Sequence, residues 1–578
     1  MKISSFSVIH YLQIAFAVLL LWFLAYLYDT DNSLIFYHWS TYLCWLCGAA
    51  GWVVAAWKKT ATNRELFGML TLCVLFYLLF ILPHDPGCIN PLIMLYATGG
   101  LYSLLSQLTA SAQEKKGVIS LFILLWIFTC HGMIQGINHD WRSLDIKALF
   151  FNAGYFGNYL ITTIPLVFSF LLYKGRRIDV TAVAGWLLFV MALTVLLLTQ
   201  ARAAIVGCTA GCMLATLLYM RERIRRKLLL LMAVALVLIP LLLAVAAKTG
   251  SSRGRLTIYT VTLEMIRDHP MSGTGAGRFG ATYNEYQAHY FQHNDVHEQT
   301  AMLADNTYEA FNILLQLLAE YGIAGLVLLV VIIRIMIKRA EAVSIFRSGD
   351  WMRKGSAGCV AGIIFSAQFS NPFHAEPVLV VFIWHVAMLT GGRKQQAATG
   401  SLTGGIFKVV TVVLFTCLSY LIVLNMRAER QWKKAADLSV CCGFESAKVY
   451  YEKAGRQLKR NGIFLFNYGA EASLAGEYKL SEQLLEQSRK YVSSSFSYTY
   501  SGDNLLAGGN LKLAEEYYLK AAWMVPSHLV PKYKLVKLYQ RTGEKEKAAY
   551  WRQKALTTPV KIPSNLMDEL IFELRRGE

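Results

Sequence analysis

The fold class of this chain follows from residues 180–220, which read VTAVAGWLLFVMALTVLLLTQARAAIVGCTAGCMLATLLYM. The stretch consists of two apolar runs, 180–199 and 203–220, joined by a short turn that carries Arg202. Each run is long enough to cross the hydrocarbon core of a bilayer, about 30 Å thick, as an α-helix. We therefore expect two membrane-spanning helices here rather than a soluble domain.

Apolar runs of similar length recur from the N-terminus to about residue 425 and predict thirteen membrane-spanning helices. The composition agrees, because 55% of the residues are hydrophobic and only 16% are charged, against roughly 25% charged in an average protein. The expected fold class is all-α, a polytopic membrane bundle over residues 1–425 whose first run is retained rather than cleaved as a signal peptide. The predicted spans are 8–27, 39–57, 65–82, 91–110, 117–135, 155–173, 180–199, 203–220, 228–247, 312–337, 356–371, 376–391 and 405–425.

Basic residues are concentrated in alternate loops, which predicts the orientation of the helices because such residues are retained on the cytoplasmic side. We expect the N-terminus in the cytoplasm and residues 248–311 and 426–578 on the external side. The formal net charge of +19 then reflects topology, and no nucleic-acid partner is expected. The basic loops carry Lys58, Lys59 and Arg64; Lys115 and Lys116; Lys174, Arg176 and Arg177; Arg221, Arg223, Arg225, Arg226 and Lys227; Lys338, Arg339, Arg347, Arg353 and Lys354; Arg393 and Lys394.

Residues 426–578 are more polar and contain a repeated pattern. The segments LAGEYKLSEQLLEQS, LAGGNLKLAEEYYLKA and QRTGEKEKAAYWRQKA align on Gly476, Gly509 and Gly543, which are 33 and 34 residues apart. A helix-turn-helix unit of 34 residues is the tetratricopeptide period. We expect a tetratricopeptide-like domain, with an irregular helical bundle as the alternative. Such domains usually bind proteins or peptides, which favours an envelope protein as a partner.

The long external segment before this domain, residues 248–311, is expected to be functional because long structured loops usually are. It contains Gly275-Ala-Gly277-Arg-Phe-Gly280, which satisfies the dinucleotide-binding fingerprint. No strand is expected before it and no βαβ unit around it. We therefore interpret these glycines as turn residues after an amphipathic helix, and we expect no cofactor and no metal.

Three arginines lie near the external membrane face, where the retention of basic residues in the cytoplasm makes them unexpected. Arg202 lies in the turn between two spans, and Arg253 and Arg255 follow the ninth span directly. Arginine beside hydrocarbon is costly unless it pairs or faces water, and its planar donor fork suits phosphate oxygens. We expect the three to bind an anionic lipid-linked substrate, with interfacial snorkelling or a salt bridge as the alternative for any one of them.

Four segments form an ordered set of motifs: FNAGYFGNYLITTIPL (151–166), LLLTQARAAIVG (196–207), RGRLTIYTVTLEMIRDHPMSGTGAGRFGATY (253–283) and AFNILLQLLAEYGIAGL (310–326). The set resembles the O-antigen ligase superfamily, which includes lipopolysaccharide O-antigen ligases, bacterial O-oligosaccharyltransferases and some O-antigen polymerases. Together with the number of predicted spans, the resemblance covers about residues 1–425.

The resemblance implies an enzyme of the bacterial inner membrane with its C-terminal domain in the periplasm. Members transfer a glycan from an undecaprenyl-diphosphate carrier to an acceptor hydroxyl, without a metal ion and with inversion at the anomeric carbon. The acceptor would be a lipid core or a protein. For this chain, the resemblance implies that Arg202 and Arg255 hold the diphosphate, with Arg253 nearby.

One position departs from the family pattern. Aligning Asn312 and the Glu320-Tyr-Gly322 segment places Phe311 where a functional histidine commonly stands, and phenylalanine cannot accept a proton. A general base must reach the acceptor hydroxyl, so we expect one from the loop that leads into the tenth span. The candidates are His297, Asp305 and Glu309, with His293 and His374 as further possibilities.

Three other functions stay open. The chain could be an O-antigen or polysaccharide polymerase, although an exported repeat domain that presents an acceptor favours ligation. It could be an inactive membrane scaffold that recruits envelope proteins through its repeats, which Phe311 would support and the three external arginines oppose. A transporter is less favoured, because transporters usually place ionisable groups at mid-membrane.

Overall fold

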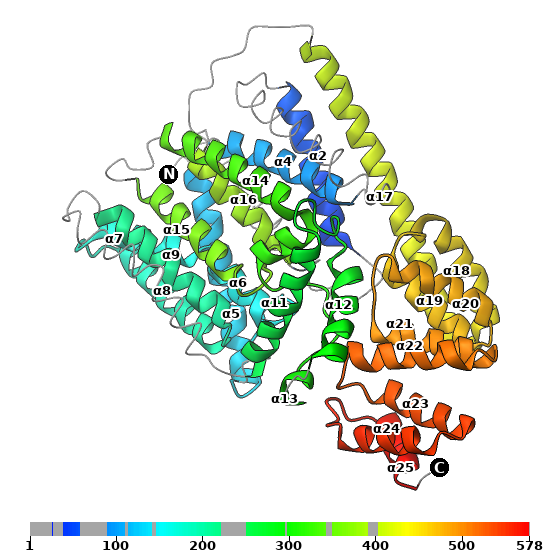
Figure 1. Cartoon of the computed structure of the whole chain (residues 1–578). Coiled ribbons are helices and arrows are strands. Elements are labelled where there is room, and N and C mark those ends of the chain that lie inside the picture. The colour runs from blue at the N-terminus through cyan, green and yellow to red at the C-terminus, as the bar shows by residue number, and fades with distance from the viewer. Residues whose placement is uncertain are drawn as a thin grey trace.

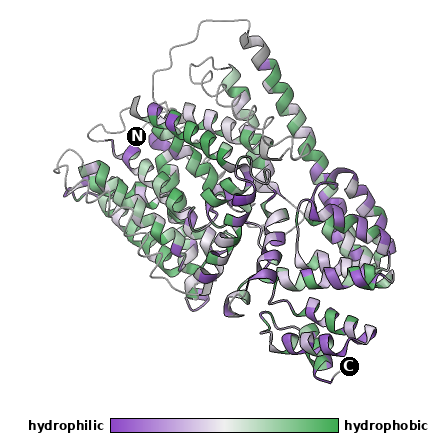
Figure 2. Cartoon of the chain, in the orientation of Figure 1, coloured by the Kyte–Doolittle hydropathy of each residue, from purple (hydrophilic) through white to green (hydrophobic). Residues whose placement is uncertain are grey.

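The computed structural model describes residues 26, 38–57, 90–109, 114–141, 146–220, 250–294, 298–342, 350–390 and 403–576. Within these ranges every regular element is a helix, which confirms the all-helical fold class (Figure 1). A body of apolar helices carries a C-terminal array of shorter and more polar helices. Figure 2 shows the change in hydropathy between the two parts.

The membrane part contains the long apolar helices of the chain. Among the described residues, seven stretches are long and apolar enough to cross a membrane: Trp39–Trp57, Glu114–Asn138, Ala153–Lys174, Val180–Leu198, Arg202–Met220, Ile313–Ala340 and Lys408–Cys442. The protein is therefore a multi-pass membrane protein. Its helices are α2 (Trp39–Trp57), α4 (Asn90–Thr109), α5 (Glu114–Asn138), α6 (Ala153–Leu160), α7 (Ile164–Lys174), α8 (Val180–Leu198), α9 (Arg202–Met220), α14 (Ile313–Ala342), α15 (Trp351–Ser366), α16 (Glu376–Thr390) and α17 (Thr403–Cys442).

The number of thirteen spans stays a prediction. The predicted spans 65–82 and 228–247 lie outside the described residues, as does 8–27 apart from residue 26. Shorter apolar helices over Ile93–Ser106 and Glu376–Thr390 correspond to two further predicted spans.

The two spans predicted within residues 180–220 are the helices α8 and α9. Asp179 caps α8, because its side chain accepts a hydrogen bond from the backbone N–H of Ala182. In the turn after α8, Gln200 has a φ of 52°, a left-handed conformation that reverses the chain within three residues. Arg202 is the first residue of α9, so the fold fixes this arginine at a helix N-terminus.

A close crossing of α9 and α15 holds this helix in place. A Cβ atom on Gly207 would lie 2.4 Å from the carbonyl oxygen of Gly362, and one on Gly211 would lie 2.5 Å from that of Gly358. Small residues four positions apart on both helices allow the two backbones to approach in this way, as they commonly do between membrane helices. The position of α9 relative to α15 is therefore set by backbone contact.

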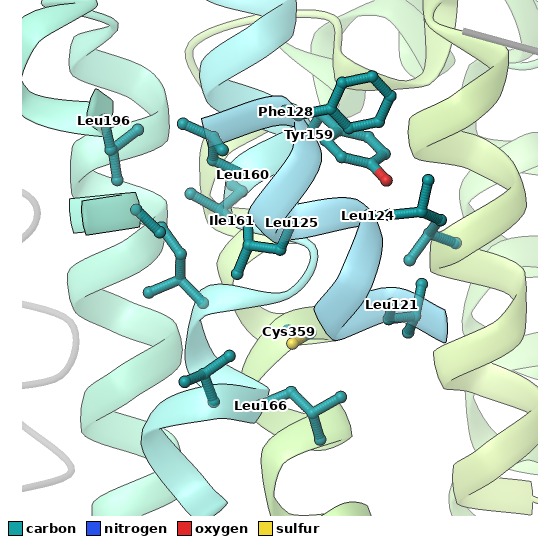
Figure 3. Packing of buried hydrophobic residues seen from close by; sticks show 14 of the residues in the cluster. Leu121, Leu124, Leu125, Phe128, Tyr159, Leu160, Ile161, Leu166, Leu196 and Cys359 are labelled. Atoms are coloured by element: carbon teal, nitrogen blue, oxygen red, sulfur yellow. The ribbon is translucent and has the colours of Figure 1, made fainter. Parts of the chain in front are cut away.

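The span predicted over 155–173 is interrupted in the structure. α6 ends at Leu160 and α7 begins at Ile164, with Pro165 in its first turn. Proline is tolerated there because an N–H group in the first turn of a helix has no partner within the helix. The carbonyl of Thr162, in the break, accepts a hydrogen bond of 2.6 Å from Nε2 of the buried His385 on α16. A buried carbonyl freed from a helix needs such a partner. Figure 3 shows the surrounding core, in which Phe128 meets Tyr159 edge-on at 4.9 Å.

The external segment and the C-terminal array follow the same all-helical plan. The external segment forms α11 (Gly250–Asp268), α12 (Phe279–His293) and α13 (Glu298–Ala301). α17 lies against α2 at the edge of the membrane part and continues into the array, where it packs against the next helix (Figure 1). The array adds α18 (Phe444–Leu458), α19 (Gly462–Leu474), α20 (Tyr478–Arg489), α21 (Ser495–Ala507), α22 (Leu511–Met524), α23 (Leu529–Thr542), α24 (Lys545–Thr557) and α25 (Asn565–Arg576).

Helices of the array pack in consecutive pairs, and a glycine lies in the turn of each pair. The predicted turns at Gly476, Gly509 and Gly543 have φ of 83°, 81° and 79°, a region that glycine enters without steric cost. Gly443, between α17 and α18, has a φ of 83° and lies 33 residues before Gly476, so it adds a unit that the sequence alignment missed. The assignment of these pairs to tetratricopeptide repeats stays a prediction.

Candidate functional site

The glycine-rich segment 273–280 of the external segment packs against a kink in α14. The kink is at Gly322, whose φ is 60°. The backbone N–H groups of Thr274 and Gly275 donate to the carbonyls of Ala319 and Glu320, at 2.8 and 3.0 Å. A Cβ atom on Gly273 would lie 2.3 Å from the carbonyl carbon of Glu320, so no larger residue fits there. These contacts agree with the interpretation of the glycines as turn residues.

The buried side chain of Glu320 completes this junction. One carboxylate oxygen accepts a hydrogen bond of 3.0 Å from the N–H of Gly277, and the other accepts one of 2.8 Å from Nε2 of Gln316. A buried carboxylate needs such donors to offset its desolvation. The junction fixes the entry of α14 relative to α11 and α12.

Phe311 precedes α14 in a left-handed conformation, with a φ of 51°, which is uncommon for a bulky residue. The hydroxyl of Tyr259, on α11, lies 3.4 Å from the Phe311 carbonyl and 3.3 Å from that of Gln368, and it donates to both. The guanidinium of Arg255, one turn earlier on α11, lies 5.7 Å from the centre of the Phe311 ring, in a cation–π contact. Phe311 is therefore in direct contact with Arg255, one of the arginines predicted to bind a diphosphate.

A cavity of about 440 Å³ lies beside this contact. Its walls contain four residues singled out from the sequence, namely Arg255, Asp305, Glu309 and Phe311. A volume of this size is within the range of small-molecule sites. The remaining lining residues are Gly254, Thr257, Ile258, Gln287, Leu303, Ala304, Asn306, Thr307 and Tyr308.

The arginines differ in their surroundings. Burial lowers the pKa of Arg255, the nearby Tyr259 hydroxyl opposes this, and the positive charge of Arg202 lowers the pKa further. Arg202 and Arg255 therefore lie within electrostatic range of each other, although they come from different parts of the chain. Arg253 is exposed and lies two positions before Arg255 on α11, which directs it to another face of the helix.

Asp305 pairs with the C-terminal array. Its carboxylate lies 3.6 Å from Nε2 of His528 and 3.9 Å from Nζ of Lys561. Interaction with His528 lowers the pKa of Asp305, burial opposes this, and the N–H of Asn306 and the charge of Lys561 lower it further. The carboxylate is thus held ionised by partners outside the membrane part.

Glu309 pairs with a loop of the membrane part. Its Oε1 lies 2.6 Å from Nδ1 of His374, and its Oε2 accepts a hydrogen bond from the side-chain amide of Asn371. Burial would raise the pKa of Glu309, but the hydrogen bond to His374, the charge of that histidine and the bond from Asn371 outweigh burial and hold the pKa below its ordinary value.

The other two candidate histidines are His297 and His293. His297 lies outside the described residues. His293 is exposed at the end of α12, where its Nδ1 donates to the carbonyl of His289 at 2.9 Å.

Two features of the site had no signal in the sequence. His374 and Glu309 belong to separate loops, and only the fold brings them together. The C-terminal array also reaches the site, because α12 packs against α22 and Gln287 donates to the carbonyls of Met524 and Asp305, at 2.6 and 3.1 Å.

A comparison with protein families identifies the part of the chain that carries the site. Residues 186–330 match the O-antigen ligase family. The match includes Arg202, Arg255, the cavity-lining loop and Phe311, and it indicates glycosyl transfer at a membrane in O-antigen or polysaccharide biosynthesis. No curated protein matches the chain.

Proposed function

We propose that this protein transfers an oligosaccharide from an undecaprenyl-diphosphate carrier to an acceptor hydroxyl on a lipid core or a protein. The observation that carries the proposal is that Arg255 lines a cavity, within electrostatic range of Arg202, inside the segment that matches the O-antigen ligase family. The site lies on the periplasmic side of the inner membrane, together with residues 426–578.

The two arginines bind the diphosphate of the donor. Each guanidinium presents a planar fork of N–H donors that matches phosphate oxygens, and Arg202 adds the N-terminus of α9, where backbone N–H groups also favour anions. A diphosphate bound between the two guanidinium groups would offset the repulsion between their positive charges. Arg253 supplies further positive charge at the membrane surface.

The reaction forms a bond between the acceptor oxygen and the anomeric carbon, and breaks the bond from that carbon to the diphosphate. Negative charge develops on the departing diphosphate, next to the arginines, so these residues stabilise the transition state without a metal ion. The acceptor proton goes to a base drawn from His297, Asp305 and Glu309 or from a group that one of them orients. The C-terminal array binds or presents the acceptor at the cavity.

Deletion of the gene in its host tests the proposal and separates its variants. Loss of long-chain lipopolysaccharide alone identifies a ligase, and loss of protein glycans identifies an oligosaccharyltransferase. Lipopolysaccharide limited to a single glycan repeat identifies a polymerase. Unchanged glycans of every class, with no build-up of lipid-linked donor, would contradict glycosyl transfer.

A further inference from the structure

The contact between Phe311 and Arg255 leaves the site without an imidazole at the position where the family commonly has one. The aromatic ring cannot take a proton, and the guanidinium 5.7 Å away is a permanent cation. Two residues before Phe311, however, the side chain of Glu309 lines the cavity and meets His374 from the loop between α15 and α16. The fold thus brings a different histidine into contact with a residue of the cavity wall.

The geometry of this pair resembles an oriented base rather than a surface ion pair. Oε1 of Glu309 lies 2.6 Å from Nδ1 of His374, while Asn371 occupies Oε2. Because both carboxylate oxygens are engaged, Glu309 is poorly placed to take a proton from a substrate itself. Its carboxylate instead fixes the tautomer of His374 with the proton on Nδ1.

The second ring nitrogen of His374 remains available. Within the part of the chain that the structure describes, Nε2 of His374 has no hydrogen-bond partner, and 57% of the side chain is exposed, against 21% for Glu309. The backbone around the ring is ordered by a 3-10 turn, η3 (Pro372–His374), in which the N–H of His374 donates to the carbonyl of Asn371 at 3.3 Å. The imidazole is therefore held at one nitrogen and open at the other.

We propose that Nε2 of His374 accepts the proton of the acceptor hydroxyl, with Glu309 as the positioning residue that holds Nδ1. This proposal rests on the proposed function, because the acceptor hydroxyl belongs to that reaction. As the acceptor oxygen bonds to the anomeric carbon, its proton passes to Nε2 and the carbon–oxygen bond to the diphosphate breaks. The diphosphate leaves as an anion beside Arg202 and Arg255. The positive charge created in the step therefore lies on the imidazole of His374, and the negative charge lies on the diphosphate.

The charges around His374 predict how the rate depends on pH. Partial removal of water around the ring lowers the pKa of His374, but the hydrogen bond to Glu309, the charge of Glu309 and the charges of Glu376 and Glu320 raise it above its ordinary value overall. The neutral imidazole is the active form, so the rate rises with pH through this raised pKa. In Glu309→Gln the largest raising influence is lost, and the acidic limb of the pH–rate profile moves to lower pH.

The test uses full-length protein added to solubilised membranes of the deletion strain, which supply their own lipid-linked glycan and acceptors. We expect His374→Ala to lower the rate roughly 10²–10⁴-fold, the usual contribution of a general base, with the acidic limb abolished. Glu309→Gln lowers the rate less and shifts the limb downward. His269→Gln, at an exposed histidine of the external segment, is the matched control and keeps both the rate and the limb.

A second variant shows whether an inactive His374→Ala protein lacks only its base or is misfolded. Phe311→His in the His374→Ala background returns an imidazole to the family position, and histidine tolerates left-handed backbone better than most residues. Recovery of transfer in the double variant shows that only the base was missing. Normal rates and unshifted pH profiles in both single variants, with Arg255→Ala inactive, would overturn the histidine proposal and leave the proposed function intact. An inactive wild type would overturn both.

Discussion

At the scale of the residue, the site depends on how Arg255 is held. Its guanidinium lies over the Phe311 ring and near Tyr259, and the positive charge of Arg202 lowers the pKa of Arg255. Bringing like charges together is unfavourable unless an anion accompanies them. The proximity of the two charges supports the proposal that Arg202 and Arg255 bind a diphosphate.

The shape of the guanidinium, and not only its charge, should matter for catalysis. Removal of one preorganised charge-stabilising donor typically costs about 10²–10³-fold in rate, so Arg255→Ala should lower transfer by that much. Arg255→Lys keeps the charge but loses the planar fork, and should recover only part of the loss. Initial rates at matched protein levels measure both, and equal rates for wild type and Arg255→Lys would show that the fork is unimportant.

At the scale of the element, the glycine run and the kink in α14 form a single joint. Gly273 and Gly322 face each other across it, and each would place a Cβ atom within 2.5 Å of the backbone of the other segment. Glu320 then closes the joint with the N–H of Gly277. Backbone contacts across this joint therefore fix the segment after α11 against α14.

Two glycines of this joint provide a matched pair of variants. Gly273 and Gly277 both have a φ of 68°, but a Cβ atom on Gly273 would collide with backbone at 2.3 Å, whereas one on Gly277 meets nothing within 4 Å. Gly277→Ala should cost only the left-handed strain, about 1–2 kcal/mol. Gly273→Ala should cost clearly more. Thermal unfolding of the purified protein compares them, and equal midpoints would argue against the backbone contact at Gly273.

At the scale of the whole molecule, the C-terminal array and the external segment form one continuous structure. Glu285 on α12 pairs with Lys520 at 2.5 Å and accepts a hydrogen bond of 2.8 Å from Tyr498. Ala288 packs with Tyr498, Met524 and neighbouring residues in a small apolar cluster. The array therefore packs against α12, the helix whose Gln287 donates a hydrogen bond to the cavity loop at Asp305.

Gln287 tests this support. Its buried amide donates to the carbonyls of Met524 and Asp305, which belong to the array and to the cavity loop. Leaving these carbonyls unpaired costs about 1–3 kcal/mol, so Gln287→Ala should speed hydrogen exchange in residues 303–309 and lower transfer. The control is Gln292→Ala, at an exposed position of the same helix. Identical exchange in the two variants would mean that the array does not hold the loop.

The sequence predicts those parts of the molecule that depend on local pattern. The helices α8 and α9 follow from apolar length. Arg255 is singled out as a positive charge at the external membrane face, and Asp305 and Glu309 because they lie close to Phe311 in the sequence. The sequence analysis missed the break at Thr162, whose carbonyl accepts a hydrogen bond from His385 of another helix, a contact with no local signal. The unit at Gly443 was missed because its first helix is the continuation of the apolar span in α17. Contacts between distant loops, such as Glu309 with His374, have no periodic signal.

Binding of undecaprenyl diphosphate tests the central claim most directly, because it needs neither the glycan nor the acceptor. We expect purified full-length protein to bind this lipid, and we expect Arg202→Ala and Arg255→Ala each to weaken binding roughly tenfold or more, since a hydrogen bond to a charged group is worth about 1.5–3 kcal/mol. Arg267→Ala, at an exposed position near the other end of α11, should bind as wild type does. Equal affinity of wild type and both alanine variants at Arg202 and Arg255 would contradict the diphosphate site.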